Sequence, residues 1–387
     1  MKKKCFITIS LIILGILTLL KSNLNNNMLA VYIDNELKDT IPSKSENLYI
    51  GNIDCDNDVS ATWDNDNWGL FINSLSKKTK CNLHFIHDTE KPYWQIESVE
   101  KTSVLSTDIF EIKISGNDAL GNVSSTLDTS NLSFYVNDTL ESPIKVELIK
   151  QEESSQKITY SIKVHMVGGE GSLKVKISGD TLTDTSSNQN DEITIDTGIN
   201  VSKNPAKIFL YYDKQHSQAQ ISEHNNTISK YYEFTIDNAA SDLNDFNQEN
   251  YDLIIFDFEG WSVPSSINNL SNINIISCGN DTTSALEIIQ NSTYSPNIVG
   301  TSNKVVNNSL TNYLPDAIVG DTDNQYLINF SSDVTVLYKN TTNGIIYDSI
   351  GYRKNNNYTW LHYQLYRLFG DEAILIPIIE FTLGELK

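Results

Sequence analysis

The chain has little positive charge and only one long apolar run. Its 387 residues include 28 lysines and arginines against 49 aspartates and glutamates, which gives a formal net charge of -21. A surface with this balance repels nucleic acids and anionic lipids, so neither is an expected partner. Outside residues 5–20 no segment is long and apolar enough to span a bilayer. We therefore expect membrane contact only through the N-terminal segment.

The N-terminal segment has the form of an export signal. Lys2, Lys3 and Lys4 precede the uncharged run CFITISLIILGILTLL at residues 5–20, which matches a positive n-region followed by an apolar h-region. No small-x-small cleavage site closes the run, so residues 1–27 are predicted to be either a signal peptide or a signal anchor. Both alternatives predict an extracellular, cell-surface protein, secreted or membrane-anchored by residues 5–20.

Cysteine is scarce, with four residues in the whole chain. Cys5 belongs to the export signal, and the absence of a CxxC spacing disfavours a zinc site. Cys55 and Cys81 each lie in a strand-like run of one small segment, so we expect them to form a disulfide in an oxidising compartment. Cys278 is then the odd thiol of the exported part.

The first exported region, residues 28–92, is predicted to be a small β module. It resembles, as a loose pattern, an N-terminal module found on exported proteins of gut Firmicutes, and the resemblance implies a structural surface module. The residues that carry the resemblance are Val31-Tyr32, Cys55, Trp63-Asp64, Trp68 and Lys80-Cys81-Asn82.

Residues 93–200 contain about seven short period-2 runs separated by turn residues, the pattern of a β-sandwich. The stretches IKISGNDALGN, LSFYVND and GSLKVKISGDTLTDTSSNQND resemble the bacterial Ig-like domains of cell-surface proteins. Some domains of that kind hold Ca²⁺ at Asp/Asn turns, which makes Asp180, Asp184, Asn188 and Asn190 candidate calcium ligands, whereas surface turn chemistry explains the same residues without an ion. We predict no bound metal and no cofactor, and leave calcium at these turns open.

A linker at residues 201–207, VSKNPAK, is predicted to lead into an α/β domain at residues 208–387. The continuous apolar runs KIFLYYD, YDLIIFDFEGW and NINIISC alternate with helix-length segments, which indicates a mainly parallel sheet covered on both faces in a three-layer domain. We expect helices at TTSALEIIQ and over TWLHYQLYRLFGDEAILIPIIEFTLG. The second would pack on the sheet through Leu361, Leu365, Leu368 and Phe369.

This order resembles the flavodoxin-like domains of the class I glutamine amidotransferase-like superfamily, over about residues 206–380. Tyr251-Asp252-Leu253-Ile254-Ile255 would be the strand before the nucleophile strand. Catalytic members of that superfamily hold the nucleophile in Gly-x-Cys-x-Gly, whereas this chain has Ile276-Ser277-Cys278-Gly279. Either Cys278 is the nucleophile and the second glycine is lost, or Ser277 takes the position and Gly279 is that glycine.

The partner base is also altered, because the His-x-Glu of the superfamily has no copy here. His362 is the one candidate, and it falls inside the expected last helix. A simpler interpretation makes Cys278 a buried residue at a strand end, followed by a turn at Gly279 and a helix cap at Asn280 and Asp281.

Two functional hypotheses follow. The first is a cell-surface binding or structural protein whose noncatalytic head meets a carbohydrate, a peptide or a neighbouring surface protein. Its ligand site would lie past the strand ends, at Asp213, Asp257, Glu259, Gly279, Asn280 and Asp281. The alternative is an exported hydrolase or amidotransferase-like enzyme that uses Cys278 or Ser277 with His362, supported by Asp257 or Glu259.

Overall fold

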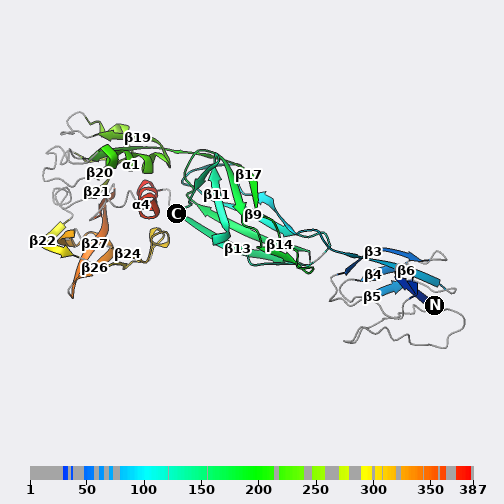
Figure 1. The fold of residues 1–387 in the computed structure, drawn as a ribbon. Helices are drawn as coiled ribbons and strands as arrows, with labels where there is room; N and C mark the ends of the chain where they lie inside the picture. Colours follow the sequence, from blue (N-terminus) through cyan, green and yellow to red (C-terminus); the bar gives the residue numbers. More distant parts are fainter. Residues whose placement is uncertain are drawn as a thin grey trace, which may run out of the picture.

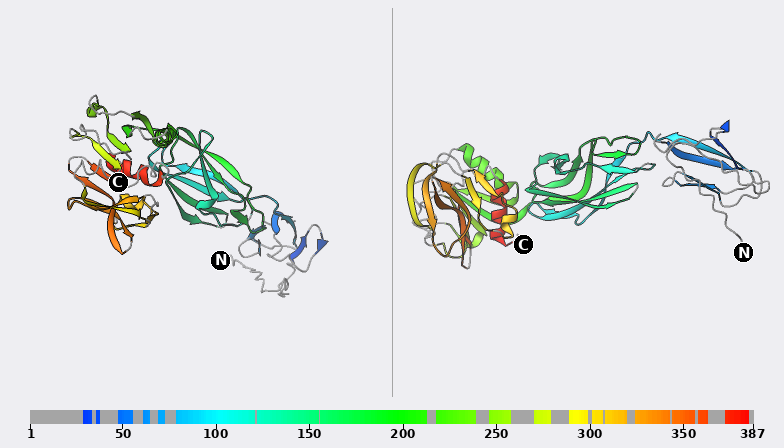
Figure 2. Two further views of the ribbon diagram at one scale, coloured as in Figure 1. Left: turned by 60° about the vertical axis from the view of Figure 1, so that its left-hand side comes forward. Right: turned by 90° about the horizontal axis from the view of Figure 1, so that it is seen from below.

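The structure is a computed structural model in which the chain is mostly β. Three groups of strands follow one another along an elongated molecule, and both described α-helices lie in the last group (Figures 1 and 2). Among the described residues no helix is long and apolar enough to cross a membrane. The described residues are 29–33, 36–37, 48–55, 61–64, 69–72, 79–120, 122–154, 156–212, 218–238, 246–257, 270–278, 289–298, 301–306, 308–319, 324–342, 344–355, 358–362 and 372–384.

The first group of strands forms two sheets. The larger has the order β2-β1-β6-β3, with β1 parallel and β3 antiparallel to β6, and the smaller pairs β4 with β5. All the secondary structure described here is strand, as the sequence predicts for this region. The elements are β1 (Leu29–Ile33), β2 (Glu36–Leu37), β3 (Leu48–Cys55), β4 (Ala61–Asp64), β5 (Gly69–Ile72) and β6 (Thr79–His87).

The second group is a sandwich of two sheets around one hydrophobic core. One sheet has the order β13-β14-β9-β7, the other β12-β11-β15-β17-β8, and β10 pairs with β16 beside them. Along β11, Leu132, Phe134 and Val136 are buried and the residues between them are not, which is the period of a strand with one face on the core. The short strands predicted for this region therefore form a β-sandwich.

The strands of this sandwich are β7 (Tyr93–Val99), β8 (Ser103–Leu105), β9 (Ile109–Asn117), β10 (Val123–Ser125), β11 (Leu132–Val136), β12 (Thr139–Glu141), β13 (Lys145–Glu153), β14 (Lys157–His165), β15 (Gly171–Ile177), β16 (Leu182–Asp184) and β17 (Ile193–Ser202). A short 3₁₀ helix, η2 (Thr129–Asn131), precedes β11.

The third group, which we call the head (residues 204–384), is built on one large mixed sheet. Its order is β19-β18-β20-β21-β28-β27-β26-β23-β24, and β22 pairs with β25 separately. The strands are parallel from β19 to β28 and antiparallel from β28 to β24. The expectation of a mainly parallel sheet is therefore met only in the first half.

The strands of the head are β18 (Asn204–Tyr212), β19 (Tyr232–Asn238), β20 (Leu253–Asp257), β21 (Asn274–Cys278), β22 (Ile289–Ile298), β23 (Thr301–Lys304), β24 (Ala317–Val319), β25 (Asn324–Phe330), β26 (Thr335–Thr342), β27 (Ile345–Lys354) and β28 (Tyr358–His362). Its helices are α1 (Gln218–Ser229) and α4 (Glu372–Leu383), with short 3₁₀ helices η3 (Gln248–Asn250) and η5 (Leu310–Asn312).

Both faces of the parallel strands are buried, which explains the continuous apolar run in β18. Ile208 and Leu210 join a core with residues of α1 and α4, whereas Phe209 and Tyr211 join a second core on the other face. Both described helices contribute to the first core. Among the described residues the second face is covered by chain around Phe246 and Tyr251 rather than by an α-helix, so helix layers on both faces are not seen there.

Two helix predictions need correction. Ile289 and Gln290, expected at the end of a helix, begin β22, and the rest of that segment lies outside the described residues. Within the stretch expected as the last helix, Glu372–Leu383 is helical, whereas Tyr358–His362 forms β28 between β21 and β27. Leu361 is thus on a strand, and Leu365, Leu368 and Phe369 lie outside the described part.

Residues 201–207 join the sandwich to the head through strands. β17 runs to Ser202 and β18 begins at Asn204, so Lys203 alone lies between them. The segment expected as a linker is therefore extended, hydrogen-bonded backbone. The division of the chain at residues 27, 92, 200 and 208 stays a prediction.

Candidate functional site

The parallel strands of the head end at one edge of the sheet, where the sequence places the candidate catalytic residues. Cys278 is the last residue of β21 and His362 the last of β28. The two strands are neighbours, and their backbone register pairs Cys278 with His362. The prediction that His362 lies in the last helix is wrong. Its place on a strand brings the two candidate residues together.

The other candidates at this edge are placed only in part. Asp257 ends β20, the strand beside β21. Asp213, Glu259, Gly279, Asn280 and Asp281 lie outside the described residues. Ser277, the alternative nucleophile, is fully buried, so its hydroxyl is closed to a substrate in this structure. Cys278 is one residue further along and ends β21, so its backbone lies nearer to the edge than that of Ser277.

The turn residues considered for calcium divide into two sets. The side-chain oxygen of Asn190 accepts the backbone N–H groups of Thr181 (2.9 Å) and Leu182 (2.7 Å), so Asn190 closes the turn itself. Asp180 is exposed and has a left-handed backbone with φ of 59°. The conformation and hydrogen bonds of the turn account for Asp180 and Asn190. Asp184 and Asn188 lie beside other buried carboxylates instead.

Asp184 belongs to a cluster of three buried carboxylates, Asp88, Asp118 and Asp184. One carboxylate oxygen from each lies within 4.8 Å of the others, and the residues are 6%, 7% and 5% exposed. Burial, together with the like charges of Asp118 and Asp184, raises the pKa of the Asp88 carboxyl, against the hydrogen bond from the Glu90 N–H, which lowers it. This cluster, which we call the acidic cluster, lies where the first strand group meets the sandwich.

The sandwich meets the head through a network of opposite charges. The Lys230 ammonium lies 3.1 Å from Glu141 of the sandwich and 3.1 Å from Glu372 at the start of α4. The Tyr231 hydroxyl donates to Glu372 at 2.8 Å. Burial disfavours the charge on Lys230, but the carboxylates of Glu141 and Glu372 outweigh it and raise the pKa of this lysine. The network is electrically complementary.

A second set of hydrogen bonds at this junction is fully enclosed. Asn204 donates through its side-chain amide to Thr107 of the sandwich (3.0 Å) and to Glu380 of α4 (3.3 Å). The Tyr232 hydroxyl donates to Glu380 at 2.7 Å, and burial, then the Glu380 charge, raise the pKa of Tyr232. Since all four side chains are buried, each bond replaces water that the groups lost on folding.

The loop after β14 inserts sandwich residues into the head. Met166, with a left-handed φ of 54°, is buried in the main core of the head. Gly168 and Gly169 also have positive φ, and a Cβ at Gly168 would lie 3.3 Å from the Tyr231 ring. The Gly169 N–H donates to the Lys230 carbonyl at 2.8 Å. Glycine is required here because the backbone must both turn and approach the ring.

His165, at the end of β14, is also buried at this junction. Its Nε2 lies 3.3 Å from Glu147, and its ring packs edge-on against Tyr313 of the head, 5.3 Å between centroids. Burial lowers the pKa of His165 to about 4, although Glu147 opposes the shift. The imidazole is therefore neutral at neutral pH.

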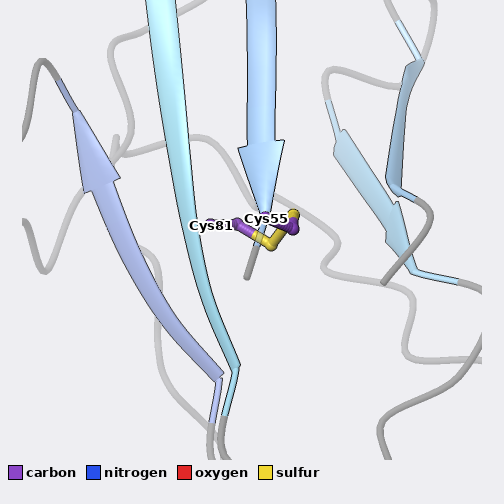
Figure 3. Close-up of a disulfide and its surroundings, with 2 residues drawn as sticks. All are labelled: Cys55 and Cys81. Atoms are coloured by element: carbon purple, nitrogen blue, oxygen red, sulfur yellow. A yellow bond between two sulfur atoms is a disulfide. The ribbon is translucent and has the colours of Figure 1, made fainter. Parts of the chain in front are cut away.

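The predicted disulfide is confirmed. Cys55 ends β3 and Cys81 lies opposite it on β6, with their Cα atoms 4.1 Å apart and their sulfurs bonded (Figure 3). The bond closes a sequence separation of 26 residues. It links two adjacent antiparallel strands and so fixes their register.

Several residues of these sites escape prediction from sequence. Asp88 follows β6 and Asp118 follows β9. In the sequence each has the form of an ordinary turn residue, with nothing to indicate that the two lie close together. Glu141, Lys230 and Glu372 are widely separated, and no local pattern pairs them. The one local signal is the Gly-Asn-Asp stretch at residues 116–118, where β9 ends and Asp118 follows it.

Comparisons with known proteins give structural neighbours only. No protein family and no curated protein matches the sequence. A ThuA-like protein from Bacteroides uniformis is similar in structure, with 13% identity and a TM-score of 0.34 over 48% of this chain and 95% of that chain.

Two structures of immunoglobulin-domain proteins are also similar. Dpr2 Ig1-Ig2 in complex with DIP-Theta Ig1-Ig3 has 13% identity and a TM-score of 0.19, over 33% of this chain and 38% of that chain. The N-terminal eight Ig domains of Down Syndrome Cell Adhesion Molecule have 7% identity and a TM-score of 0.19, over 36% and 20%. This chain thus spans less than half of either Ig-domain chain. Since every TM-score is below 0.5, the description of the fold rests on the strands of this chain.

Proposed function

We propose that this chain is an exported cell-surface binding or structural protein, in which a β-rich stalk carries a noncatalytic α/β head. The observation that supports the proposal most is the Cys55–Cys81 disulfide, because disulfides persist in oxidising, extracellular compartments. The lysines and apolar run at the N-terminus give an export route that fits the same compartment.

Surface labelling of cells tests this location. The full chain, with an epitope tag after Lys387, is expressed in a Gram-positive host and intact cells are treated with a membrane-impermeant amine biotinylation reagent. We expect the chain to be biotinylated and to be degraded by external trypsin, while a cytoplasmic control protein is not. Labelling that requires cell lysis would contradict export.

We further infer that the head is a flavodoxin-like domain of the class I glutamine amidotransferase-like kind. Numbered in chain order, the parallel strands β19-β18-β20-β21-β28 follow the order 2-1-3-4-5, which is the order of flavodoxin-like sheets. The strands β22 to β27 would then be an insertion before the last parallel strand. Fold analogy alone assigns no activity.

The ligand of the head would be a carbohydrate, a peptide or a neighbouring surface protein bound at the carboxyl edge of the parallel strands, where Asp257 ends β20. The test is binding of the tagged chain to carbohydrate and peptide arrays and to cell-wall fractions. Asp257→Ala should weaken binding at least tenfold. The control Asp333→Ala changes an exposed residue on the antiparallel side and should have no effect. Equal binding by both variants would place the ligand elsewhere.

The register pair of Cys278 and His362 supports a second function, an exported hydrolase with a cysteine nucleophile and a histidine base. A thiolate activated by an imidazole reacts with iodoacetamide at pH 6 much faster than free cysteine does. His362→Gln should then slow alkylation of Cys278 more than tenfold. Alkylation at the rate of free cysteine, unchanged by His362→Gln, would exclude this enzyme.

A further inference from the structure

The acidic cluster combines three features that a turn does not explain. Its carboxylates come from separate segments: Asp88 follows the last strand of the first group, Asp118 follows β9, and Asp184 ends β16. All three residues are more than nine-tenths buried, and an oxygen from each lies within 4.8 Å of the others. Like charges placed this close in a buried site repel one another strongly.

Asp88 gives a second, independent indication of a ligand. Its Oδ1 accepts the Glu90 N–H at 3.0 Å. Its Oδ2 is buried to less than 1 Å² and has no hydrogen-bond partner. A buried carboxylate oxygen that has lost its water and gained no donor is costly. One oxygen of the Asp88 carboxylate also lies within 4.8 Å of oxygens of Asp118 and Asp184, and a proton or a cation would relieve the repulsion among the three charges.

We propose that Asp88, Asp118 and Asp184 bind a hard divalent cation, Ca²⁺, that fastens the start of the sandwich to the segment leading out of the first strand group. The donor set is all oxygen, which Ca²⁺ prefers and Zn²⁺ does not. Ligands on opposite sides of an ion with bonds of about 2.4 Å lie about 4.8 Å apart, the span within which the three carboxylate oxygens fall.

The hydrogen bonds that these carboxylates accept do not prevent them from binding an ion as well. Asp118 accepts the Leu120 N–H at 2.7 Å, and Asp184 accepts both the Asn188 N–H and its side-chain amide at 2.8 Å. A carboxylate oxygen carries two lone pairs and can accept a hydrogen bond while it ligates a cation. The side-chain amide of Asn188 also donates to the backbone carbonyl of Asp88 at 3.1 Å. The loop after β16 therefore fixes the backbone of Asp88 beside Asp184.

The site differs from the four turn residues that the sequence offers as candidate calcium ligands. Of the four turn residues considered there, Asp184 is a ligand and Asn188 supports it, whereas Asp180 and Asn190 take no part. Asp88 and Asp118 replace them. The proposal does not depend on what the head binds.

Calcium titration of the chelator-treated full chain tests the proposal. Isothermal titration with CaCl₂ should find one site per chain, with a dissociation constant of about 10⁻³ M or tighter, and MgCl₂ should bind more weakly. Asp88→Asn and Asp118→Asn should each lower the Ca²⁺ affinity at least tenfold, and both keep the oxygen that accepts a backbone N–H. Asp180→Asn is the matched control, since it removes one exposed charge from the same turn region, and should bind as the natural chain does.

Thermal unfolding keeps the test decisive if a variant fails to fold. In the natural chain CaCl₂ should raise the midpoint of the sandwich transition, and NaCl at equal ionic strength should not. Without Ca²⁺, Asp88→Asn should melt no lower than the natural chain because one repelling charge is gone. No binding and no shift up to about 10 mM CaCl₂, or equal affinity in Asp88→Asn, would overturn the site and leave a shared proton as the occupant.

Discussion

The sandwich has one junction with the head and another with the first strand group. Buried charges are arranged differently at the two. Toward the head, the charges are complementary, with Lys230 between Glu141 and Glu372. Toward the first strand group, the three carboxylates of the acidic cluster carry charges of one sign in the described part of the chain. The charges at the first junction are therefore balanced within the chain. At the second junction a proton or a cation would relieve the repulsion among the carboxylates, so we expect the packing of this junction to depend on pH and on divalent cations.

The head junction also has buried apolar contacts, whereas the ion pair described below, near the other junction, is exposed. Met166 of the sandwich is buried in the core of the head beside Tyr231, and Ile144 packs against that core. The segment between the first strand group and the sandwich has an ion pair of Lys91 with Asp191 at 2.6 Å, but both side chains are mostly exposed. Exposed pairs contribute little. We infer that the sandwich and head move as one unit, and that the first group is joined to them more weakly.

The largest expected effect comes from removing the disulfide. The double variant Cys55→Ala, Cys81→Ala reopens a loop with a sequence separation of 26 residues, which the chain-entropy relation values at about 3.5 kcal/mol. Calorimetry should show a lower midpoint for the first strand group alone. An equal shift of the sandwich and head transitions would contradict the weak coupling at this junction.

The next effect tests the charged network of the head junction. Lys230→Met leaves Glu141, which is 7% exposed, without its cation, and should lower the free energy of unfolding by about 3 kcal/mol. Lys174→Met is the control, because Lys174 has a similar exposure of 31% but pairs with Asp138, which is 77% exposed. The control should cost less than about 1 kcal/mol. Denaturant titration measures both, and equal losses would mean that the network does not hold the junction.

The enclosed hydrogen bonds should have a smaller effect. Tyr232→Phe removes the hydroxyl that donates to Glu380 at 2.7 Å and should lower the free energy of unfolding by about 2 kcal/mol, since the acceptor is a buried carboxylate. Tyr135→Phe, at a half-exposed position of the sandwich, should change it by less than about 0.5 kcal/mol. Denaturant midpoints at constant slope measure the difference. Indistinguishable midpoints would contradict the assigned bond.

The smallest expected effect is a dependence on pH at His165. Its folded pKa of about 4 lies below the ordinary 6.5, so between these values the unfolded chain binds more protons than the folded one. Stability is therefore present above pH 6.5 and is lost as pH falls toward 4, by about 1.4 kcal/mol at pH 5.5. His165→Phe keeps a ring against Tyr313 and should remove this part of the slope. Parallel stability curves for both chains over pH 5–7 would contradict the assignment.

The strands of this fold are predictable wherever burial has a simple period. Leu132, Phe134 and Val136 alternate on one face, and the β18 run around Phe209 and Leu210 is buried on both, so either pattern is legible in the sequence. The error at residues 358–362 has a clear cause. Leu361 and Leu365 are spaced as in a helix. Residues 358–362 nevertheless form a strand, because they pair with β21 on one side and β27 on the other.

The candidate sites are less predictable because they depend on register and on contacts distant in sequence. Cys278 and His362 could each be singled out, but their pairing follows from β28 lying beside β21. Asp88 and Asp118 meet Asp184 only after the sandwich has closed. Lys230 could pair with any of many acidic residues until α4 brings Glu372 to it.

The most direct test of the contrast between the junctions is a pair of distance distributions from spin labels on unnatural amino acids. One pair joins the exposed positions Thr62 and Glu152, across the junction of the first group, and the other joins Glu152 and Asp316, across the head junction. The account predicts that removing Ca²⁺ broadens the first distribution and leaves the second narrow. Two distributions that respond alike, or a first distribution that ignores Ca²⁺, would contradict it.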